Sequence, residues 1–456
     1  MSYYQYPFPS CPDSVSRTFL LTCSIYLLLF ASLVFLNADL LGLVLPILVF
    51  LLYGWWSAPK DGGLYVRRRF SSERLTVGEP VEVSVSIINN GSHLNEALIE
   101  DLIPVGLSLI SGSPRHVISL VTGEEFIFRY RLRGNRGACA MGSLKVTTTD
   151  PLGLFPRSYL LGTAGNLIVF PRVLPLGRIA IRPRRTRLYA GSIPARVGGT
   201  GLEFFGVRDF QPGDPPRVIN WRASVRRSSG LPEGNLAANT RNVNLKLISN
   251  QYLQERVADV GIVLDGRELS NWMAGESLFE KSVMASASLA DAFLKLGNRV
   301  GLLVYGQYLD WTPPAYGKLQ RERILQSLAR ARLGSSSVFA GLDGISTRMF
   351  PAESQIVLVS PLVNEDWSIL VRLRSHAYQV LVLSPDPLAF EYSHLRRSAE
   401  LDVALRMARL ERKLLIRKLE RAGIHVIEWD VSKPFEQVVQ SQLMRYRPVG
   451  SQGYIP

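Results

Sequence analysis

Two uncharged, apolar segments near the start of the chain constrain its fold more than any other feature. They cover residues 18–36 and 40–56, and each is close to the ~20 residues that a helix needs to cross a bilayer. The second contains Pro46, which a membrane helix tolerates because neighbouring groups satisfy the freed backbone. We therefore expect a transmembrane helical hairpin over residues 18–56, preceded by a short N-terminal tail, residues 1–17.

Charged residues around these segments predict their orientation. Arg17 precedes the first segment, Lys60 and the run Arg67-Arg68-Arg69 follow the second, and the loop between the segments carries only Asp39. Basic residues are retained on the cytoplasmic side of a membrane. We therefore expect a two-pass protein of the cell membrane, with its N-terminus and its soluble domains in the cytoplasm.

The composition limits the classes of partner and cofactor. The chain has 52 Lys and Arg residues against 38 Asp and Glu, a net charge of +14, which favours anionic partners. Because the basic residues are spread along the chain and flank the membrane segments, we expect contacts with anionic lipid headgroups rather than with nucleic acid. The three cysteines and five histidines have no zinc or disulfide spacing, and we expect no cofactor.

Residues 64–175 have the pattern of a β domain. Val81, Val83, Val85 and Ile87 alternate with polar residues, which predicts a strand with one buried face. The dipeptide Asn90-Gly91 follows and favours a hairpin turn. Seven or so short strands predict an immunoglobulin-like β-sandwich with an interaction role. The other strand-like runs are residues 97–103, 116–121, 125–133, 143–149 and 159–170.

Residues 176–258 form a connector with a dense motif, EFFGVRDFQPGDPPRVINWRASVRR, over residues 203–227. Pro212-Gly213 predicts a turn, and the surrounding arginines, carboxylates and aromatic rings predict an ordered ion-pair network at a domain junction, with Phe204, Phe205, Phe210 and Trp221 buried beside it. The residues expected to form this structural or interaction site are Phe205, Arg208, Asp209, Pro212, Gly213, Asp214, Arg217, Asn220, Trp221, Ser224 and Arg226.

Two other roles of the motif remain open at the level of sequence. The arginines could bind an anion or a phosphate group. Alternatively, Asp209 and Asp214 could act as the paired carboxylates of a hydrolase. The arginines argue against the second role, because they would hold both carboxylates ionised and lower their pKa values. No nucleophile elbow, P-loop or zinc signature accompanies the pair.

Residues 259–447 alternate between strands and helices. Continuous apolar strands separated by helices predict a parallel sheet covered on both faces, and such sheets hold ligands beyond the carboxyl ends of their strands. That rule indicates Asp265, Tyr305, Ser360 and Ser384-Pro385-Asp386. The expected strands are residues 259–265, 299–306, 355–360, 379–384 and 425–430, and the expected helices lie within residues 278–296, 319–332, 366–374 and 391–422.

The connector motif resembles the hallmark of the prokaryotic domain-of-unknown-function family fifty-eight, F-x-x-R-D-F-x-P-G-D-x-x-R-x-I-x-W-x-x-S-x-R, over residues 205–226. The resemblance extends to the membrane pair, to the DPLGLF segment at residues 150–155, and to the C-terminal region. It implies a von Willebrand factor A-like α/β domain. It also implies association with MoxR-type AAA+ ATPases, in the assembly or maturation of partner complexes, and no established enzymatic activity.

A von Willebrand factor A domain holds Mg²⁺ through D-x-S-x-S at the end of its first strand, and this hard cation requires oxygen ligands. With Asp265 as the first ligand, Arg267 and Leu269 stand where the two serines would be. We therefore expect a degenerate site without a metal. The alternative is that Ser270 and the run Ser335-Ser336-Ser337 supply oxygens in a shifted register.

These features favour a membrane-anchored, non-catalytic scaffold or adaptor that mediates protein–protein interactions. Its expected partners are the membrane, a cytoplasmic AAA+ ATPase of MoxR type, and client proteins. The alternative function is a metal-dependent ligand-binding receptor that uses a von Willebrand factor A-type metal site. The helix over residues 399–421 is expected to bury its periodic leucines, while its basic residues could dock an acidic partner or lipid headgroups. The leucines are Leu401, Leu405, Leu410, Leu414, Leu415 and Leu419.

Overall fold

The computed structural model describes residues 17–58, 63–163, 165–177, 187–228, 247–271, 273–274, 276–306, 308–334, 349–392, 395 and 398–444. The expected N-terminal tail up to residue 16 and the run Ser335-Ser336-Ser337 lie outside these residues. The chain forms two compact units, Met1–Pro171 and Arg172–Pro456.

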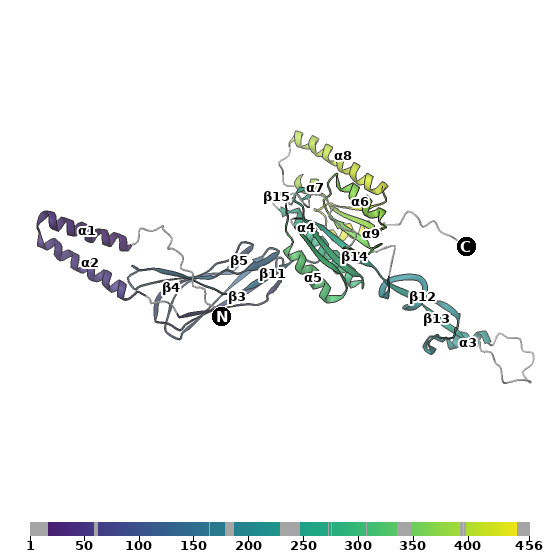
Figure 1. The fold of residues 1–456 in the computed structure, drawn as a ribbon, viewed down its shortest axis with the longest axis horizontal. Coiled ribbons are helices and arrows are strands. Elements are labelled where there is room, and N and C mark those ends of the chain that lie inside the picture. Colours follow the sequence, from purple (N-terminus) through teal and green to yellow (C-terminus); the bar gives the residue numbers. More distant parts are fainter. Residues whose placement is uncertain are drawn as a thin grey trace, which may run out of the picture. The chain divides into compact units, whose positions relative to one another are not determined.

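Two apolar helices open the first unit (Figure 1). Helix α1 covers Arg17–Phe35 and α2 covers Ala38–Trp56, and they lie side by side. Asn37 caps α2, because its side chain accepts a hydrogen bond of 2.9 Å from the backbone N–H of Asp39. Most apolar side chains of both helices are exposed. Both helices are long and apolar enough to cross a membrane.

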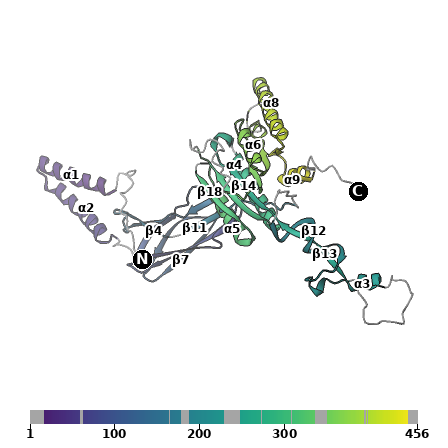
Figure 2. The same ribbon diagram turned by 45° about the vertical axis from the view of Figure 1, so that its right-hand side comes forward.

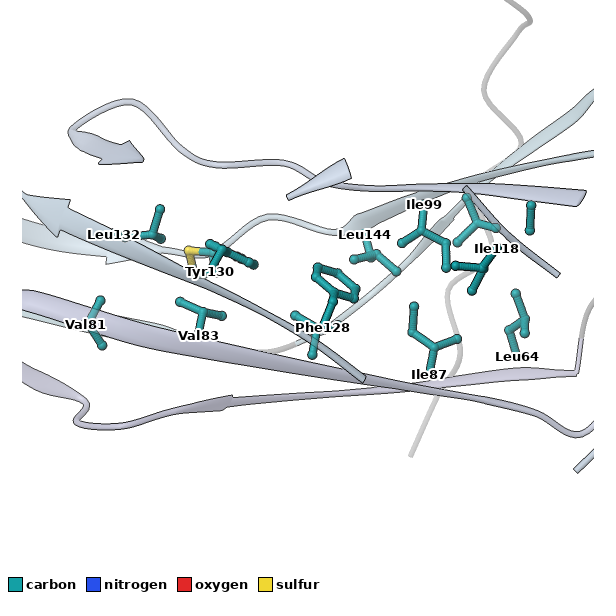
Figure 3. Close-up of a cluster of buried hydrophobic side chains, with 14 of the residues drawn as sticks. Leu64, Val81, Val83, Ile87, Ile99, Ile118, Phe128, Tyr130, Leu132 and Leu144 are labelled. Carbon is teal, nitrogen blue, oxygen red and sulfur yellow. The ribbon is translucent and has the colours of Figure 1, made fainter. Parts of the chain in front are cut away.

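Two four-stranded antiparallel sheets form the β-rich body of the first unit. Their inner faces share one core (Figure 3), in which strand alternation places Val81, Val83, Val85 and Ile87 opposite residues such as Ile99 and Leu144. One sheet has the order β1-β3-β7-β5 (Leu64–Phe70, Pro80–Asn89, Glu125–Gly134, Leu107–Gly112), the other β10-β9-β4-β6 (Arg157–Leu161, Leu144–Thr149, Leu94–Asp101, Arg115–Leu120), and a small sheet has the order β2-β11-β8 (Arg74–Thr76, Asn166–Phe170, Gly137–Ala140).

The hairpin expected at Asn90-Gly91 is wrong. Strand β3 pairs with β1 and β7, whereas β4 pairs with β6 and β9. The chain therefore passes from one sheet to the other at this point. Asn89 supports the crossing: its side chain accepts a hydrogen bond from the N–H of Gly91 and donates to the carbonyls of Ser92 and Leu120.

A buried ionic cluster joins the two sheets. Arg68 on β1 donates from Nε to Asp101 Oδ2 on β4 at 3.2 Å, and also from Nη2 to Asp101 Oδ1. Tyr130 on β7 donates its hydroxyl to the same carboxylate at 2.5 Å. The side chains of Arg68 and Asp101 are fully buried. Burial, reinforced by the charge of Asp101, raises the pKa of Tyr130, so the phenol remains a hydrogen-bond donor.

The DPLGLF segment forms a turn around Asp150. The Asp150 carboxylate accepts hydrogen bonds from the N–H groups of Leu152, Leu154 and Phe155, the last two at 2.7 Å. This turn contacts the end of α2, because a Cβ at Gly54 would lie only 2.9 Å from Leu154 Cδ1. A glycine at this position therefore permits close packing of the turn against the helix.

The second unit contains a six-stranded sheet with the order β18-β17-β14-β19-β20-β21. Five strands are parallel, but the edge strand β18 runs antiparallel to β17, so the purely parallel sheet expected from the sequence is a mixed one. The strands are β18 (Leu309–Ala315), β17 (Arg299–Tyr305), β14 (Asp259–Asp265), β19 (Gln355–Val359), β20 (Gln379–Pro385) and β21 (His425–Trp429).

Helices cover both faces of this sheet (Figures 1 and 2). Helices α6 (Asp366–Ser375) and α8 (Ala399–Arg421) pack on the face that carries Val263, Leu303 and Leu358. Helices α4 (Leu278–Lys295) and α5 (Gly317–Arg330) pack against β14 and β17. The remaining helices of this region are α7 (Pro387–Tyr392) and α9 (Phe435–Met444).

The connector forms a two-stranded antiparallel ribbon, which we call the arm. Its strands are β12 (Arg187–Asp209) and β13 (Ile248–Val257), with several register shifts between them. A 3-10 turn, η1 (Pro216–Val218), and helix α3 (Trp221–Ser228) follow β12. Figure 2 shows α3 beside the ribbon. The arm leads into β14, because β13 ends at Val257 and β14 begins at Asp259.

Candidate functional site

The candidate site lies at the carboxyl ends of β14 and β19. From β14 the sheet extends through β17 and β18 on one side and through β19, β20 and β21 on the other. The strand order reverses between β14 and β19, and sheets of this type bind ligands at such a point. Asp265 ends β14, and Ser360 directly follows β19.

The guanidinium of Arg267 occupies this position and bridges two aspartates. It donates from Nε to Asp265 Oδ1 at 2.9 Å and from Nη2 to Asp265 Oδ2 at 2.8 Å. It also donates from Nη1 to Asp366 Oδ1 at 3.0 Å and from Nη2 to Asp366 Oδ2 at 2.9 Å. Asp366 begins α6. Both contacts are therefore bidentate, the geometry in which a planar guanidinium binds carboxylates most specifically.

Hydroxyl and amide groups complete the shell around Asp265. Ser270 Oγ and Ser360 Oγ both donate to Asp265 Oδ2, at 2.7 and 2.6 Å. Asn271 Nδ2 donates to the carbonyl of Arg267 at 2.8 Å and holds the loop that follows β14. The side chains of Arg267, Asp265 and Asp366 are only 4%, 0% and 2% exposed, so the charges balance one another with little help from water.

The electrostatics keep the guanidinium charged. Burial disfavours its charge, but the hydrogen bonds and charges of Asp265 and Asp366 outweigh burial and raise the pKa of Arg267 above its usual range. Burial raises the pKa of Asp366, and Arg267 opposes that rise. An arginine does not lose its proton in proteins. The site is therefore suited to holding a loop and a helix together rather than to proton transfer.

The degenerate metal site expected at Asp265, Arg267 and Leu269 thus divides into two parts. Asp265 and Arg267 form the buried pair, whereas the Leu269 side chain is 65% exposed. The oxygens of Asp265, Ser270, Ser360 and Asp366 are of the kind that a hard cation uses, and here they surround a guanidinium. Among the residues that the structure describes, no group of three or more His, Cys, Asp and Glu side chains is arranged to hold a metal ion.

A second buried arginine lies at the same edge of the sheet. Arg412 of α8 donates from Nη1 to the carbonyl of Pro361 at 2.7 Å and from Nη2 to Ser384 Oγ at 2.8 Å. Its side chain is 9% exposed and lies near Asp386 and Glu428. Burial lowers the pKa of Arg412, and the two carboxylates oppose the shift. Three of the strand-end residues predicted from the sequence, Ser360, Ser384 and Asp386, therefore contact or adjoin an arginine.

The connector motif forms a separate cluster on the arm. Arg208 Nη2 donates to Asp214 Oδ1 at 2.6 Å, and Asp214 Oδ2 accepts hydrogen bonds from the N–H of Gln211 and from Ser249 Oγ. These contacts, with the backbone N–H of Gln211 foremost, lower the pKa of Asp214. Asp209 pairs instead with Arg227, at 2.8 Å. The two aspartates thus have separate arginine partners, as expected for structural ion pairs.

Asn220 and Ser224 attach α3 to the ribbon. Asn220 Oδ1 accepts a hydrogen bond from the N–H of Ala223, and its Nδ2 donates to Asn250 Oδ1 at 2.9 Å. Ser224 Oγ accepts from the N–H of Ile248 at 2.9 Å. Gly213 has a φ of +106°, which fits the predicted turn and favours glycine. Pro212, Gly213, Arg217 and Arg226 are exposed, and the side chain of Phe205 lies outside the described residues.

The expected burial of aromatic residues beside this cluster is wrong for two of them. Trp221 is 61% exposed and Phe204 is 58% exposed, as are the apolar residues Val207, 52%, and Val225, 58%. Polar hydrogen bonds hold the arm together, and its apolar side chains face outwards. An exposed tryptophan surrounded by arginines has the composition of an interaction hot spot.

The attachment of α3 makes a direct prediction. Replacing Asn220 by alanine removes the side chain that caps α3 and binds Asn250, and we expect a local loss of about 1 kcal/mol. Amide hydrogen exchange in α3 should then become roughly fivefold faster. The control is Arg226→Ala on the exposed face of the same helix, which should change little. Equal exchange in both variants would contradict the role given to Asn220.

Sequence reasoning missed two residues of the site. Asp366 appears in the sequence as the first residue of a helix, and Arg412 as one of many basic residues on another. The distance in sequence from Arg267 to Asp366 is 99 residues, so no local pattern connects them. The available signal was the single arginine two positions after a strand-end aspartate, in a region that places charged residues next to apolar strands.

Comparisons with known proteins add a distant relative. No family model matches this chain. "Uncharacterized protein YeaD" of Bacillus subtilis (strain 168) is 24% identical over 279 residues, which cover 59% of this chain and 64% of that relative. The chain therefore spans slightly less than two thirds of the length of the curated relative that it matches.

Solved structures offer only partial likenesses. The cupredoxin domain of amoB from Nitrosocaldus yellowstonii has 13% identity and a TM-score of 0.18, covering 23% of this chain and 86% of that chain. Native alpha-2-macroglobulin from Escherichia coli has 18% identity and a TM-score of 0.19, covering 25% of this chain and 24% of that chain. Scores of this size support no conclusion about function. The chain is, in sum, similar to one uncharacterized bacterial protein over somewhat more than half its length.

Proposed function

We propose that this protein is a membrane-anchored, non-catalytic scaffold that binds other proteins. The observation that carries the proposal is the guanidinium of Arg267, held by Asp265 and Asp366 where a sheet of this order would otherwise bind a ligand. The site is filled by the chain's own cation. Its residues are arranged to fix the loop after β14 and the start of α6, and they have no group poised for acid–base or nucleophilic chemistry.

The fold supports the same function. The strand order and the antiparallel edge strand are compatible with a von Willebrand factor A-like domain, and the two packed sheets of the first unit with an immunoglobulin-like sandwich. Helices α1 and α2 would anchor the chain in the cell membrane. Because Arg17 and the run Arg67-Arg68-Arg69 flank them, both soluble regions would lie in the cytoplasm.

The partner that we propose is a MoxR-type AAA+ ATPase, with client proteins whose assembly or maturation depends on it. The support is the resemblance of residues 205–226 to the motif of domain-of-unknown-function family fifty-eight, together with the exposed position of Trp221 on the arm. In this proposal Asp214, Asn220 and Ser224 keep the arm rigid, and Trp221 contacts the partner.

Purified components test this function. The full chain, in mild detergent, is mixed with the MoxR-type ATPase of the same organism, and the complex is measured by size-exclusion chromatography and by biolayer interferometry. We expect a stable complex that Trp221→Ala weakens by at least roughly tenfold. Trp367→Ala, at a tryptophan that is 43% exposed on α6, is the matched control and should bind normally. The absence of a complex with the unmodified chain would remove the ATPase from the proposal.

A further inference from the structure

Helix α8 has an exposed apolar stripe on the side that faces away from the sheet. Its buried residues are Leu415, Ile416 and Leu419, whereas Val403, Met407, Leu410 and Leu414 are 53%, 62%, 62% and 57% exposed. The burial expected for Leu410 and Leu414 is therefore wrong. At 100° per residue the exposed stripe lies on the face opposite the buried one, so α8 is apolar on two opposite faces.

The spacing of the stripe is that of a helix-packing seam. Its four residues are separated by four, three and four positions, the pattern of consecutive a and d positions in a heptad repeat. The stripe is also narrow, because its members fall within about 60° of one another on the helical wheel. A helix that lies on a lipid surface has a broader apolar face, usually more than about 100° wide. The narrow seam favours one partner helix.

Charge on the borders of the stripe defines the partner further. Arg406, Lys413 and Arg417 line one border, and the other carries Glu400 and Glu411. Arg406 donates from Nε to the backbone carbonyl of Asp402. Among the described residues, the structure shows no ion pair for these three basic side chains. Their charges are therefore available to an acidic group on whatever covers the stripe.

A second copy of this chain fits the stripe less well. In an antiparallel pair with aligned stripes, Arg406 of one copy would lie beside Lys413 of the other, and symmetry would repeat the repulsion. In a parallel pair, Arg406 would face Glu411, but Lys413 would face Lys418, so attraction and repulsion offset each other. A lipid surface with anionic headgroups would attract one border and repel Glu400 and Glu411 on the other.

We propose that the outer face of α8 docks an amphipathic helix of a partner protein, with an apolar seam against Val403, Met407, Leu410 and Leu414 and an acidic border against Arg406, Lys413 and Arg417. Apolar residues of the partner would bury the seam. The charged border would set its orientation and reject basic helices. This surface is distinct from the arm, and the proposal does not depend on the identity of the partner that the arm binds.

Designed peptides test the surface directly. Fluorescent peptides of about three heptads carry leucine at the a and d positions. Two of them carry glutamate at either the e or the g positions, with glutamine at the other, so that both helix directions are sampled. A third carries lysine instead of glutamate. Each is titrated with the full chain in phosphatidylcholine nanodiscs, and binding is followed by fluorescence anisotropy.

We expect one of the acidic peptides to bind, and the lysine peptide to bind at least roughly tenfold more weakly. The double variant M407E/L410E should lose at least roughly tenfold in affinity. Arg406→Glu should weaken binding severalfold, whereas Arg409→Glu, the same change of charge farther from the stripe, should stay within about twofold. These residues are exposed, so the thermal unfolding of the variants should match that of the unmodified chain.

Four outcomes would overturn the proposal. They are the absence of acidic-peptide binding, equal binding of the lysine peptide, equal losses in Arg406→Glu and Arg409→Glu, and unchanged binding in M407E/L410E. Two further measurements distinguish other occupants. Self-association that disappears in M407E/L410E would assign the stripe to a second copy. Loss of peptide binding in nanodiscs with about one third phosphatidylserine would assign it to the lipid surface.

Discussion

Replacing Arg267 by methionine is expected to destabilise the α/β region by about 3–5 kcal/mol, because it leaves two buried carboxylates without their cation. For a region of this size the melting temperature should fall by on the order of 10 °C. The measurement is amide hydrogen exchange in β14 and β19 of the full chain in detergent. The control is Arg299→Met, which removes a partly exposed pair with Asp259 and should cost no more than about 1 kcal/mol.

The same variant should show a new dependence on pH. Arg267 is what opposes the rise in the pKa of Asp366, whereas burial and the charge of Asp265 both raise it. Without the guanidinium, the folded-state pKa values lie further above those of the unfolded chain. The folded state then binds more protons, so the stability of the variant increases as the pH falls from 7 towards the unfolded pKa. A deficit that stays constant from pH 7 to about pH 5 would contradict this assignment.

Removing Asp101 should have a comparable effect on the first unit. Asp101→Leu leaves Arg68 buried without its carboxylate and takes away the acceptor of Tyr130. We expect a loss of about 3–5 kcal/mol, which in a sandwich of this size lowers the melting temperature by on the order of 15 °C or prevents folding. Protease resistance of strands β1 and β4 in the full chain reports the change.

The control for this variant lies on the same sheet. Glu82→Gln removes exposed pairs with Arg129 and Arg131, which should cost less than about 1 kcal/mol. The double variant Arg68→Leu/Asp101→Leu should recover part of the loss, because neither partner is then left charged and buried. No recovery in the double variant would mean that Asp101 acts mainly through Tyr130.

Much of the fold follows from local patterns in the sequence. The apolar strands of the second unit and the alternation at Val81, Val83, Val85 and Ile87 agree with the observed strands. Pairing between strands was less accessible, because alternation shows which face is buried but not which strand lies alongside. The hairpin expected at Asn90-Gly91 failed for this reason, since the turn connects two sheets.

Helical periodicity had a similar limit in α8. Leu410 and Leu415 both recur at helical spacing, yet only Leu415 is buried. A helix with apolar residues on two faces has two periodic stripes, and the sequence does not tell which one meets the core. The aromatic residues of the arm gave the same ambiguity. Trp221 has the composition of a core residue, but the polar contacts of Asn220 and Ser224 fix the helix with that ring outwards.

The candidate site was predictable in position but not in content. The rule that ligands bind beyond strand carboxyl ends located Asp265 and Ser360. The replacement of serine by Arg267 indicated a defective cation site. The bidentate contact with Asp366 required the fold, because α6 brings that residue from another part of the chain. Two oxygen-rich groups that would suit a cation are therefore bound to an arginine.

Isothermal titration with Mg²⁺ and Mn²⁺ tests the central claim most directly, namely that a guanidinium has taken the place of a metal ion. We compare the unmodified full chain in detergent with Arg267→Ser/Leu269→Ser, which restores hydroxyls at both positions, and with Asp265→Ala. We expect no saturable binding to the unmodified chain, and weak binding in the double variant. Stoichiometric binding to the unmodified chain that Asp265→Ala abolishes would show that the site holds a metal and would contradict the account.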